Sequence, residues 1–230
     1  MTPLLALFDV DGTLFLSDDR LAGEALLGSL RELYPVEPPA DAVERVDHRG
    51  QTSLRIMREV LRAEGLGDAA IDDRLADARS LSARRYLELL EATDTSSWQA
   101  AAGEKAALAR LSDGMLLALL TGNPKPIARA RMARLGLDGF FPEGQGAFGC
   151  DAEGRRCLLD MARERAGGWP AQRTVEVGDT PRDVSSAHAA DVRAIAVRSP
   201  RNPDGFPDPD AVCDDLAAVA DVLLAWSRRA

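Results

Sequence analysis

Three short segments of the chain carry residues that could do chemistry, and each of them includes or follows an apolar run. They are DVDGT (9–13), LLTGN (119–123) and VGDTPRD (177–183). Their four carboxylates belong to Asp9, Asp11, Asp179 and Asp183. Carboxylates that are brought together repel one another unless they hold a cation, and Mg²⁺ prefers oxygen ligands of this kind. The segments therefore predict a magnesium site, provided that the fold brings them to one place.

Each segment also has an ordinary structural explanation when it is taken alone. Two acids around one valine are typical of a turn or a helix cap, T-G-N is a common turn, and G-D-x-x-x-D is typical of an N-cap followed by an acid in the first helical turn. The three segments occur in this order, and each stands at the end of an apolar run. This joint pattern favours one shared site over three unrelated turns.

The apolar runs predict the strands that must position these residues. Four runs, separated by helix-like stretches, are expected to form strands buried on both faces, and a fifth strand is expected around 211–213. The four runs are 4–10, 115–120, 174–177 and 193–197. Alternation of such strands with helices predicts a parallel α/β sheet. Ligands of open parallel sheets bind beyond the carboxyl ends of the strands, which is where the three segments would lie.

The interval between the first two strands, residues 17–95, is too long for a simple crossover. Its apolar residues recur at helical spacing in three stretches, and it has no clear strand pattern. We therefore expect an α/β catalytic core made of residues 1–16 and 96–230, and a helical cap domain made of residues 17–95 set over the carboxyl edge of the sheet. The segment 199–210, rich in proline and aspartate, is expected to be an exposed connection.

Composition limits the partners and the location of the protein. The chain has 230 residues, 46% of them apolar, which is enough for a substantial core. A net charge of -9 argues against nucleic acid or an anionic membrane as the principal partner. The first apolar run is short, and no basic stretch precedes it, so we expect neither a signal peptide nor a membrane helix. Three cysteines without a paired framework favour a reducing cytoplasm.

The sequence resembles the haloacid dehalogenase-like hydrolases, in the branch that has a helical cap after the first motif. The resemblance covers nearly the whole chain and rests on the three segments and on HRGQTSLRIM (48–57), which is similar to a turn and helix of phosphoglycolate-phosphatase-like members. It implies a Rossmann-like parallel-sheet core with an inserted all-helical cap. It also implies a phosphatase that hydrolyses a small phosphate monoester through an aspartyl-phosphate, because the dehalogenases of the family lack the acid found here at Asp11.

The resemblance assigns roles to the site residues. It makes Asp9 the nucleophile and Asp11 the group that protonates the leaving alcohol and later activates water. The Mg²⁺ ligands that it implies are Asp9, the backbone carbonyl of Asp11, Asp179 and Asp183, the last binding the ion or ordering its waters. The residues expected at the phosphoryl group are Thr121, Gly122 and Asn123, with Gly12 allowing the turn that brings both acids to one site.

The family pattern also requires a cation, usually a lysine before the third segment, to balance the nucleophile and the phosphate. Residues 148–162 contain no lysine, so Arg155 or Arg156 must supply the charge. Adjacent arginines on a helix face different ways, and Arg155 is favoured because it matches members with an arginine just inside this helix. Lys125 is a rival cation. In the turn of the cap, His48 and Arg49 are expected where the cap could meet the substrate.

Two other functions stay open. A sugar-phosphate mutase needs a cap that excludes water tightly, and its known relatives use a cap lysine that residues 17–95 lack, which favours a phosphatase. Phosphonate hydrolysis through a Schiff base needs a cap lysine as well and is excluded. A catalytically silent binding protein would keep the same acids without turnover. The expected partner is a small phosphorylated metabolite, and the expected assembly is a monomer or a homodimer.

Overall fold

The computed structural model describes residues 3–200 and 205–229. Its six strands form one parallel sheet with the order β3-β2-β1-β4-β5-β6. The strands are β1 (Leu4–Phe8), β2 (Met115–Thr121), β3 (Ala147–Phe148), β4 (Thr174–Gly178), β5 (Arg193–Val197) and β6 (Ala211–Cys213). The expected parallel α/β sheet is confirmed, and all five expected strands are present. The two-residue strand β3 was not predicted, because a run of two residues carries no pattern.

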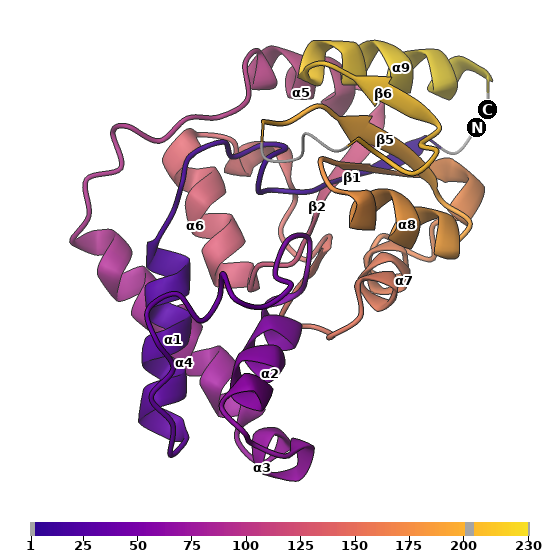
Figure 1. Ribbon diagram of the computed structural model, residues 1–230. Coiled ribbons are helices and arrows are strands. Elements are labelled where there is room, and N and C mark those ends of the chain that lie inside the picture. The colour runs from indigo at the N-terminus through magenta and orange to yellow at the C-terminus, as the bar shows by residue number, and fades with distance from the viewer. Residues whose placement is uncertain (1–2, 201–204, 230) are drawn as a thin grey trace.

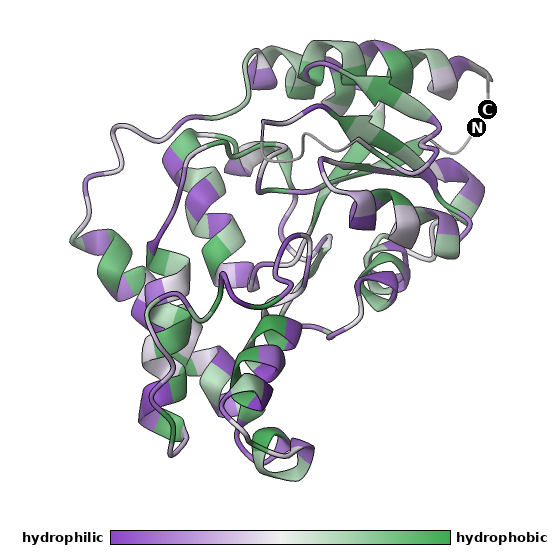
Figure 2. Cartoon of the chain, viewed as in Figure 1, coloured by the Kyte–Doolittle hydropathy of each residue, from purple (hydrophilic) through white to green (hydrophobic). Residues whose placement is uncertain are grey.

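The central strands are buried on both faces, and most of their residues are apolar. In β1, Leu4, Ala6 and Phe8 pack with α5 (Glu104–Ser112), α6 (Lys125–Leu135) and α9 (Leu216–Arg229). Leu5 and Leu7 face the other side, where α7 (Arg155–Arg165) and α8 (Pro181–Ala189) cover the sheet. Figure 1 shows this three-layer arrangement, and Figure 2 shows the hydrophobic strands between helices of mixed polarity.

Strand order reverses at the centre of the sheet, between β1 and β4. From β1 the chain first builds outward through β2 and β3, and then returns to the other side of β1 to build β4, β5 and β6. Ligands of open α/β sheets bind at such a reversal, outside the carboxyl ends of the strands. The first and third segments of the sequence leave β1 and β4 at this point, so the fold brings them side by side.

The helical interval forms its own packed cluster. It contains α1 (Leu21–Leu33), α2 (Ser53–Ala63), α3 (Asp68–Asp72) and α4 (Leu75–Glu91). Buried apolar residues of the four helices, among them Leu30, Met57 and Ile71, pack together separately from the two faces of the sheet. In Figure 1 these helices lie together below the sheet. The separate cluster supports the proposed division at residues 17–95, whose limits stay a prediction.

The remaining expectations concern single segments. The predicted exposed connection 199–210 has no regular structure in its described part, and residues 201–204 of it lie outside the described residues. Among the helices of the described residues, none is long and apolar enough to cross a membrane.

Candidate active site

A cluster of three carboxylates lies at the reversal of strand order. Asp9 follows β1, Asp179 follows β4, and Asp183 lies in the first turn of α8. All three residues are buried, and one carboxylate oxygen of each lies within 4.8 Å of the others. The fold therefore brings three of the four predicted carboxylates to one point.

Local hydrogen bonds explain why these acids converge. The pairing of β1 with β4 continues past the strand end, because the Asp9 amide donates to the Val177 carbonyl at 2.9 Å. A capping box begins α8: Thr180 Oγ1 accepts from the Asp183 amide, while the Asp183 carboxylate accepts from the Thr180 amide at 2.7 Å. The cap fixes the direction of the Asp183 side chain.

Two glycines allow the carboxylates to approach the backbone. Gly12 has a φ of 82°, and a Cβ at this position would lie 2.0 Å from Asp179 Oδ2. A Cβ at Gly178 would lie 2.4 Å from Asp183 Oδ2. Any larger residue at either position would therefore displace an acid of the cluster.

Arg155 is the cation in contact with this cluster. Its Nη2 lies 3.5 Å from Asp9 Oδ1 and 3.2 Å from Glu176 Oε1, and it also pairs with Asp183. Arg156, the next residue, is exposed, and Lys125 pairs with Glu143 at 2.5 Å. Of the three cations considered from the sequence, the structure brings Arg155 to the acids.

Burial controls the charge of these groups. It raises the pKa of Asp9 well above its usual value; Arg155 opposes this rise, and Asp183 and Asp179 add to it. Burial likewise raises the pKa of Glu176 to about 8. The acids around Arg155 outnumber the single positive charge that it supplies. This all-oxygen donor set with excess negative charge fits a hard divalent cation.

Asp11 lies beside the cluster and has different contacts. Its carboxylate accepts hydrogen bonds from Arg131 Nη1 at 2.9 and 3.1 Å and from Asn123 Nδ2. Asn123 Nδ2 also donates to Thr121 Oγ1 at 3.2 Å. The second predicted segment therefore meets the first through the Asn123 side chain.

Sequence reasoning missed Arg131. It lies on α6 in a buried stripe with Ile127, Ala128 and Met132, so its position follows helical spacing. A charged residue at helical spacing from Ile127, Ala128 and Met132 was the available signal, because burial of a guanidinium requires partners.

Comparisons with known proteins agree with this geometry. A family model described as haloacid dehalogenase-like hydrolase matches residues 4–191. The chain belongs to this family. The expected hydrolase and its Rossmann-like core are thereby confirmed.

Two curated relatives of this hydrolase cover most of its length. It is 32% identical to a phosphoglycolate phosphatase of Rhodospirillum rubrum, over 96% of this chain and 91% of the relative. It is 29% identical to a phosphoglycolate phosphatase of Pseudomonas putida, over 94% of this chain and 78% of the relative.

Solved structures share the fold at lower identity. CbbY from Rhodobacter sphaeroides, in complex with phosphate, matches with a TM-score of 0.64 and 17% identity, over 95% of this chain and 96% of that chain. A 2-haloacid dehalogenase from Pseudomonas syringae matches with a TM-score of 0.58 and 24% identity, over 98% of this chain and all of that chain (100%).

A cavity of about 1200 Å³ in this hydrolase opens beside the carboxylate cluster. It lies between the sheet edge and the helical interval. Predicted site residues that line it are Asp9, Asp11, His48, Arg49, Thr121, Gly122, Asn123, Arg155 and Asp179. Gly12, Arg156 and Asp183 are not among its lining residues. The cavity has room for a small phosphorylated molecule.

The turn 48–53 of the interval lies against the sheet edge. The Ser53 amide donates to the Gly122 carbonyl at 2.8 Å, and Arg155 Nη1 donates to the Gly50 carbonyl at 3.4 Å. Arg182 Nη1 donates to the Arg49 carbonyl at 2.6 Å. The predicted cap turn therefore forms one wall of the cavity.

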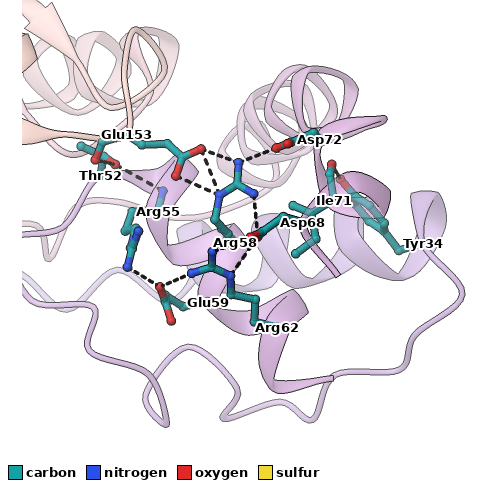
Figure 3. Close-up of polar contacts among 10 residues, drawn as sticks. All are labelled: Tyr34, Thr52, Arg55, Arg58, Glu59, Arg62, Asp68, Ile71, Asp72 and Glu153. Atoms are coloured by element: carbon teal, nitrogen blue, oxygen red, sulfur yellow. Dashed lines mark hydrogen bonds and ion pairs between the residues drawn. The ribbon is translucent and has the colours of Figure 1, made fainter. Parts of the chain in front are cut away.

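A partly buried ion pair joins the interval to the segment before α7. Arg58 on α2 binds both carboxylate oxygens of Glu153, with its Nε at 3.1 and 2.9 Å. Its Nη2 also contacts Asp72 at 2.6 Å, and Thr52 Oγ1 donates to the Glu153 carbonyl at 2.8 Å (Figure 3). Because Arg155 follows Glu153 by two residues, these contacts also tie the start of α7 to the interval.

Proposed function

We propose that this hydrolase is a magnesium-dependent phosphatase that acts on a small phosphate monoester through an aspartyl-phosphate. The observation that carries the proposal is the buried cluster of Asp9, Asp179 and Asp183 beside Arg155. Two curated relatives are phosphoglycolate phosphatases, which supports a small phosphorylated metabolite as the substrate class.

Asp9 is the proposed nucleophile. One of its carboxylate oxygens attacks phosphorus, and the bond between phosphorus and the leaving oxygen breaks with its electron pair on that oxygen. A carboxylate and a phosphate dianion repel each other, so the attack needs positive charge at the site. Arg155 supplies part of this charge, and a bound Mg²⁺ would neutralise the phosphoryl oxygens.

Asp11 is the proposed acid and base. Its carboxyl proton passes to the leaving oxygen as the alcohol departs. In the second step the Asp11 carboxylate takes a proton from water, the water oxygen bonds to phosphorus, and the bond from phosphorus to Asp9 breaks. Inorganic phosphate leaves, and both carboxyl groups return to their starting states.

The other site residues are proposed to bind. Mg²⁺ would be held by Asp9, the backbone carbonyl of Asp11, Asp179 and Asp183. The phosphoryl oxygens would meet the Thr121 hydroxyl and the backbone of Gly122 and Asn123, at the turn before α6. Arg49 would meet the rest of the substrate. Gly12 and Arg156 do not line the cavity, so we propose no contact between them and the substrate.

Turnover of p-nitrophenyl phosphate by the full chain tests the proposal. The metal-free protein should be inactive, and added Mg²⁺ should restore turnover. Asp9→Asn should abolish turnover while the circular dichroism spectrum stays that of the wild type. A panel of metabolite phosphates, read by phosphate release, then identifies the substrate class. Equal rates for wild type and Asp9→Asn would reject the enzyme, and release of an isomerised sugar phosphate without free phosphate would favour a mutase.

We also propose a cytoplasmic location and a monomer or homodimer. Cys150, Cys157 and Cys213 are free thiols, as expected in a reducing compartment. Light scattering on the same preparation measures the assembly.

A further inference from the structure

The guanidinium of Arg131 lies between Asp11 and two residues of the helical interval. Its Nη1 donates to both Asp11 oxygens, at 2.9 and 3.1 Å. On its other side, Nε and Nη2 lie 2.9 and 2.8 Å from Asp19 Oδ2, and Nε lies 3.3 Å from the Tyr86 hydroxyl. Asp19 belongs to the segment that enters the interval, and Tyr86 lies on α4.

Only one member of this group reaches the cavity to a large extent. The side chains of Arg131 and Asp19 are 3% and 2% exposed, and Tyr86 is fully buried, whereas the Asp11 side chain is 37% exposed. The buried members cannot reorient without losing charge-assisted hydrogen bonds. Arg131 therefore holds Asp11 from the buried side, while the Asp11 side chain is partly exposed at the cavity.

Aromatic rings fix the plane of the guanidinium. Its central carbon lies 5.0 Å from the centroid of Phe15 and 5.7 Å from that of Tyr86. The Tyr86 hydroxyl donates to Asp19 Oδ2 at 2.8 Å and so fixes the acid on the far side. A planar guanidinium that binds two acids from opposite ends transmits a change in position of one acid to the other.

We propose that Arg131 is a positioning residue for Asp11, and that it makes the position of the Asp11 carboxylate depend on the helical interval through Asp19 and Tyr86. The inference rests on the proposed acid and base role of Asp11. Proton transfer requires this carboxyl group within hydrogen-bond reach of the leaving oxygen. Arg131 contacts both oxygens of the Asp11 carboxylate, so its loss removes the contact that fixes both of them in place.

A comparison of two leaving groups distinguishes a positioning role of Arg131 from a general loss of structure. An alkoxide is a poor leaving group and must be protonated as it departs, whereas p-nitrophenolate leaves without a proton. The value of kcat/KM covers steps up to departure of the leaving group. Poor positioning of Asp11 therefore lowers kcat/KM for an alkyl phosphate more than for p-nitrophenyl phosphate.

The experiment measures kcat/KM of the full chain with Mg²⁺ for 2-phosphoglycolate, or the best alkyl phosphate of the panel, and for p-nitrophenyl phosphate. Arg131→Gln should lower the ratio of the two values by about tenfold or more, a fraction of what general acid catalysis contributes. Arg129→Gln is the matched control on the same helix, because Arg129 binds Asp138 and the Phe141 carbonyl instead. Its ratio should equal that of the wild type.

Tyr86→Phe keeps the inference testable if Arg131→Gln does not fold. It removes one hydroxyl from the interval side of the group, and the ratio should fall in the same direction by about threefold, the loss of part of one hydrogen bond. Asp11→Asn is the reference and should lower the ratio most. If Asp11→Asn lowers the ratio and both other variants leave it unchanged, the inference on Arg131 is wrong and the proposed function stands. If Asp11→Asn leaves the ratio unchanged, the acid role of Asp11 fails and the inference on Arg131 fails with it.

Discussion

At the scale of single residues, three buried acids are stabilised because they contact the same arginine. Asp9, Glu176 and Asp183 all contact Arg155, which is itself buried. Burial of unpaired charge is costly, so each acid depends on its contacts with this guanidinium, and on any cation that binds the cluster. Substitution of Arg155 should therefore change turnover, and substitution of Glu176 should change the pH dependence of stability.

Arg155→Ala should lower turnover of p-nitrophenyl phosphate about a hundredfold, because it removes a buried cation from the nucleophile and the phosphoryl group. Arg156→Ala is the matched control, since Arg156 is exposed on the same helix, and should change turnover less than about twofold. Arg155→Lys keeps the charge without the planar fork and should lie between them. Steady-state rates with Mg²⁺ make the comparison, and a larger loss in Arg156→Ala would contradict the choice of Arg155.

Glu176→Gln should make the stability of the metal-free protein less sensitive to a rise in pH from 4.5 to about 8. Burial raises the pKa of Glu176 from its ordinary value of 4.5 to about 8. Between these values the folded protein binds a proton that the unfolded chain releases, so stability falls as the pH rises through this range. Glutamine does not titrate, and its oxygen can still accept from Arg155. Urea unfolding across this range in EDTA should give a flatter pH dependence for the variant, and equal slopes would refute the assignment.

At the scale of elements, the sequence was most informative where pattern and chemistry coincide. The apolar runs predicted five of the six strands, because strands buried on both faces need continuous apolar sequence. The same topology explains why the polar segments at the ends of β1, β2 and β4 meet, because parallel strands end at one edge of the sheet. The two-residue β3 and the partners of Arg131 and Arg58 could not be predicted, because they depend on contacts between residues far apart in the chain.

Arg58→Met should destabilise the contact between α2 and the segment before α7. Arg58 is buried and binds the partly buried Glu153 and the exposed Asp72, so its removal leaves a partly buried acid without its cation. Breaking such a pair should lower the free energy of unfolding by roughly 2 kcal/mol, less than for a fully buried pair because Glu153 is partly exposed. Urea unfolding measures the change.

Arg62→Met is the control for this prediction. Arg62 lies on α2, one turn beyond Arg58, and pairs with Asp68 and Glu59 at the surface. Screening by solvent makes such pairs weak, so stability should stay near that of the wild type. A loss as large as that of Arg58→Met would mean that the helix, and not the buried pair, is sensitive to substitution.

At the scale of the whole molecule, the sheet and the helical interval have their own hydrophobic clusters, and both parts line the cavity. The sheet edge supplies the carboxylate cluster, and the helical interval supplies the opposite wall and the contacts to Arg131 behind Asp11. Metal binding at the sheet edge would join segments that are distant in sequence, from the ends of β1 and β4 and the start of α8. A cation bound there stabilises the folded chain as a whole, because the unfolded chain lacks the site.

Mg²⁺ should therefore raise the unfolding temperature of the wild type, and EDTA should reverse the rise. At a concentration about a hundredfold above the dissociation constant, one site contributes about 2.7 kcal/mol. Asp179→Asn should remove most of this stabilisation, because the variant loses a charged oxygen ligand of the cluster. Asp113→Asn makes the same change of charge at an exposed position after α5, before β2 begins, and should keep the full response. Calorimetry with and without Mg²⁺ measures all three proteins; an equal response of Asp179→Asn and the wild type would locate the cation elsewhere.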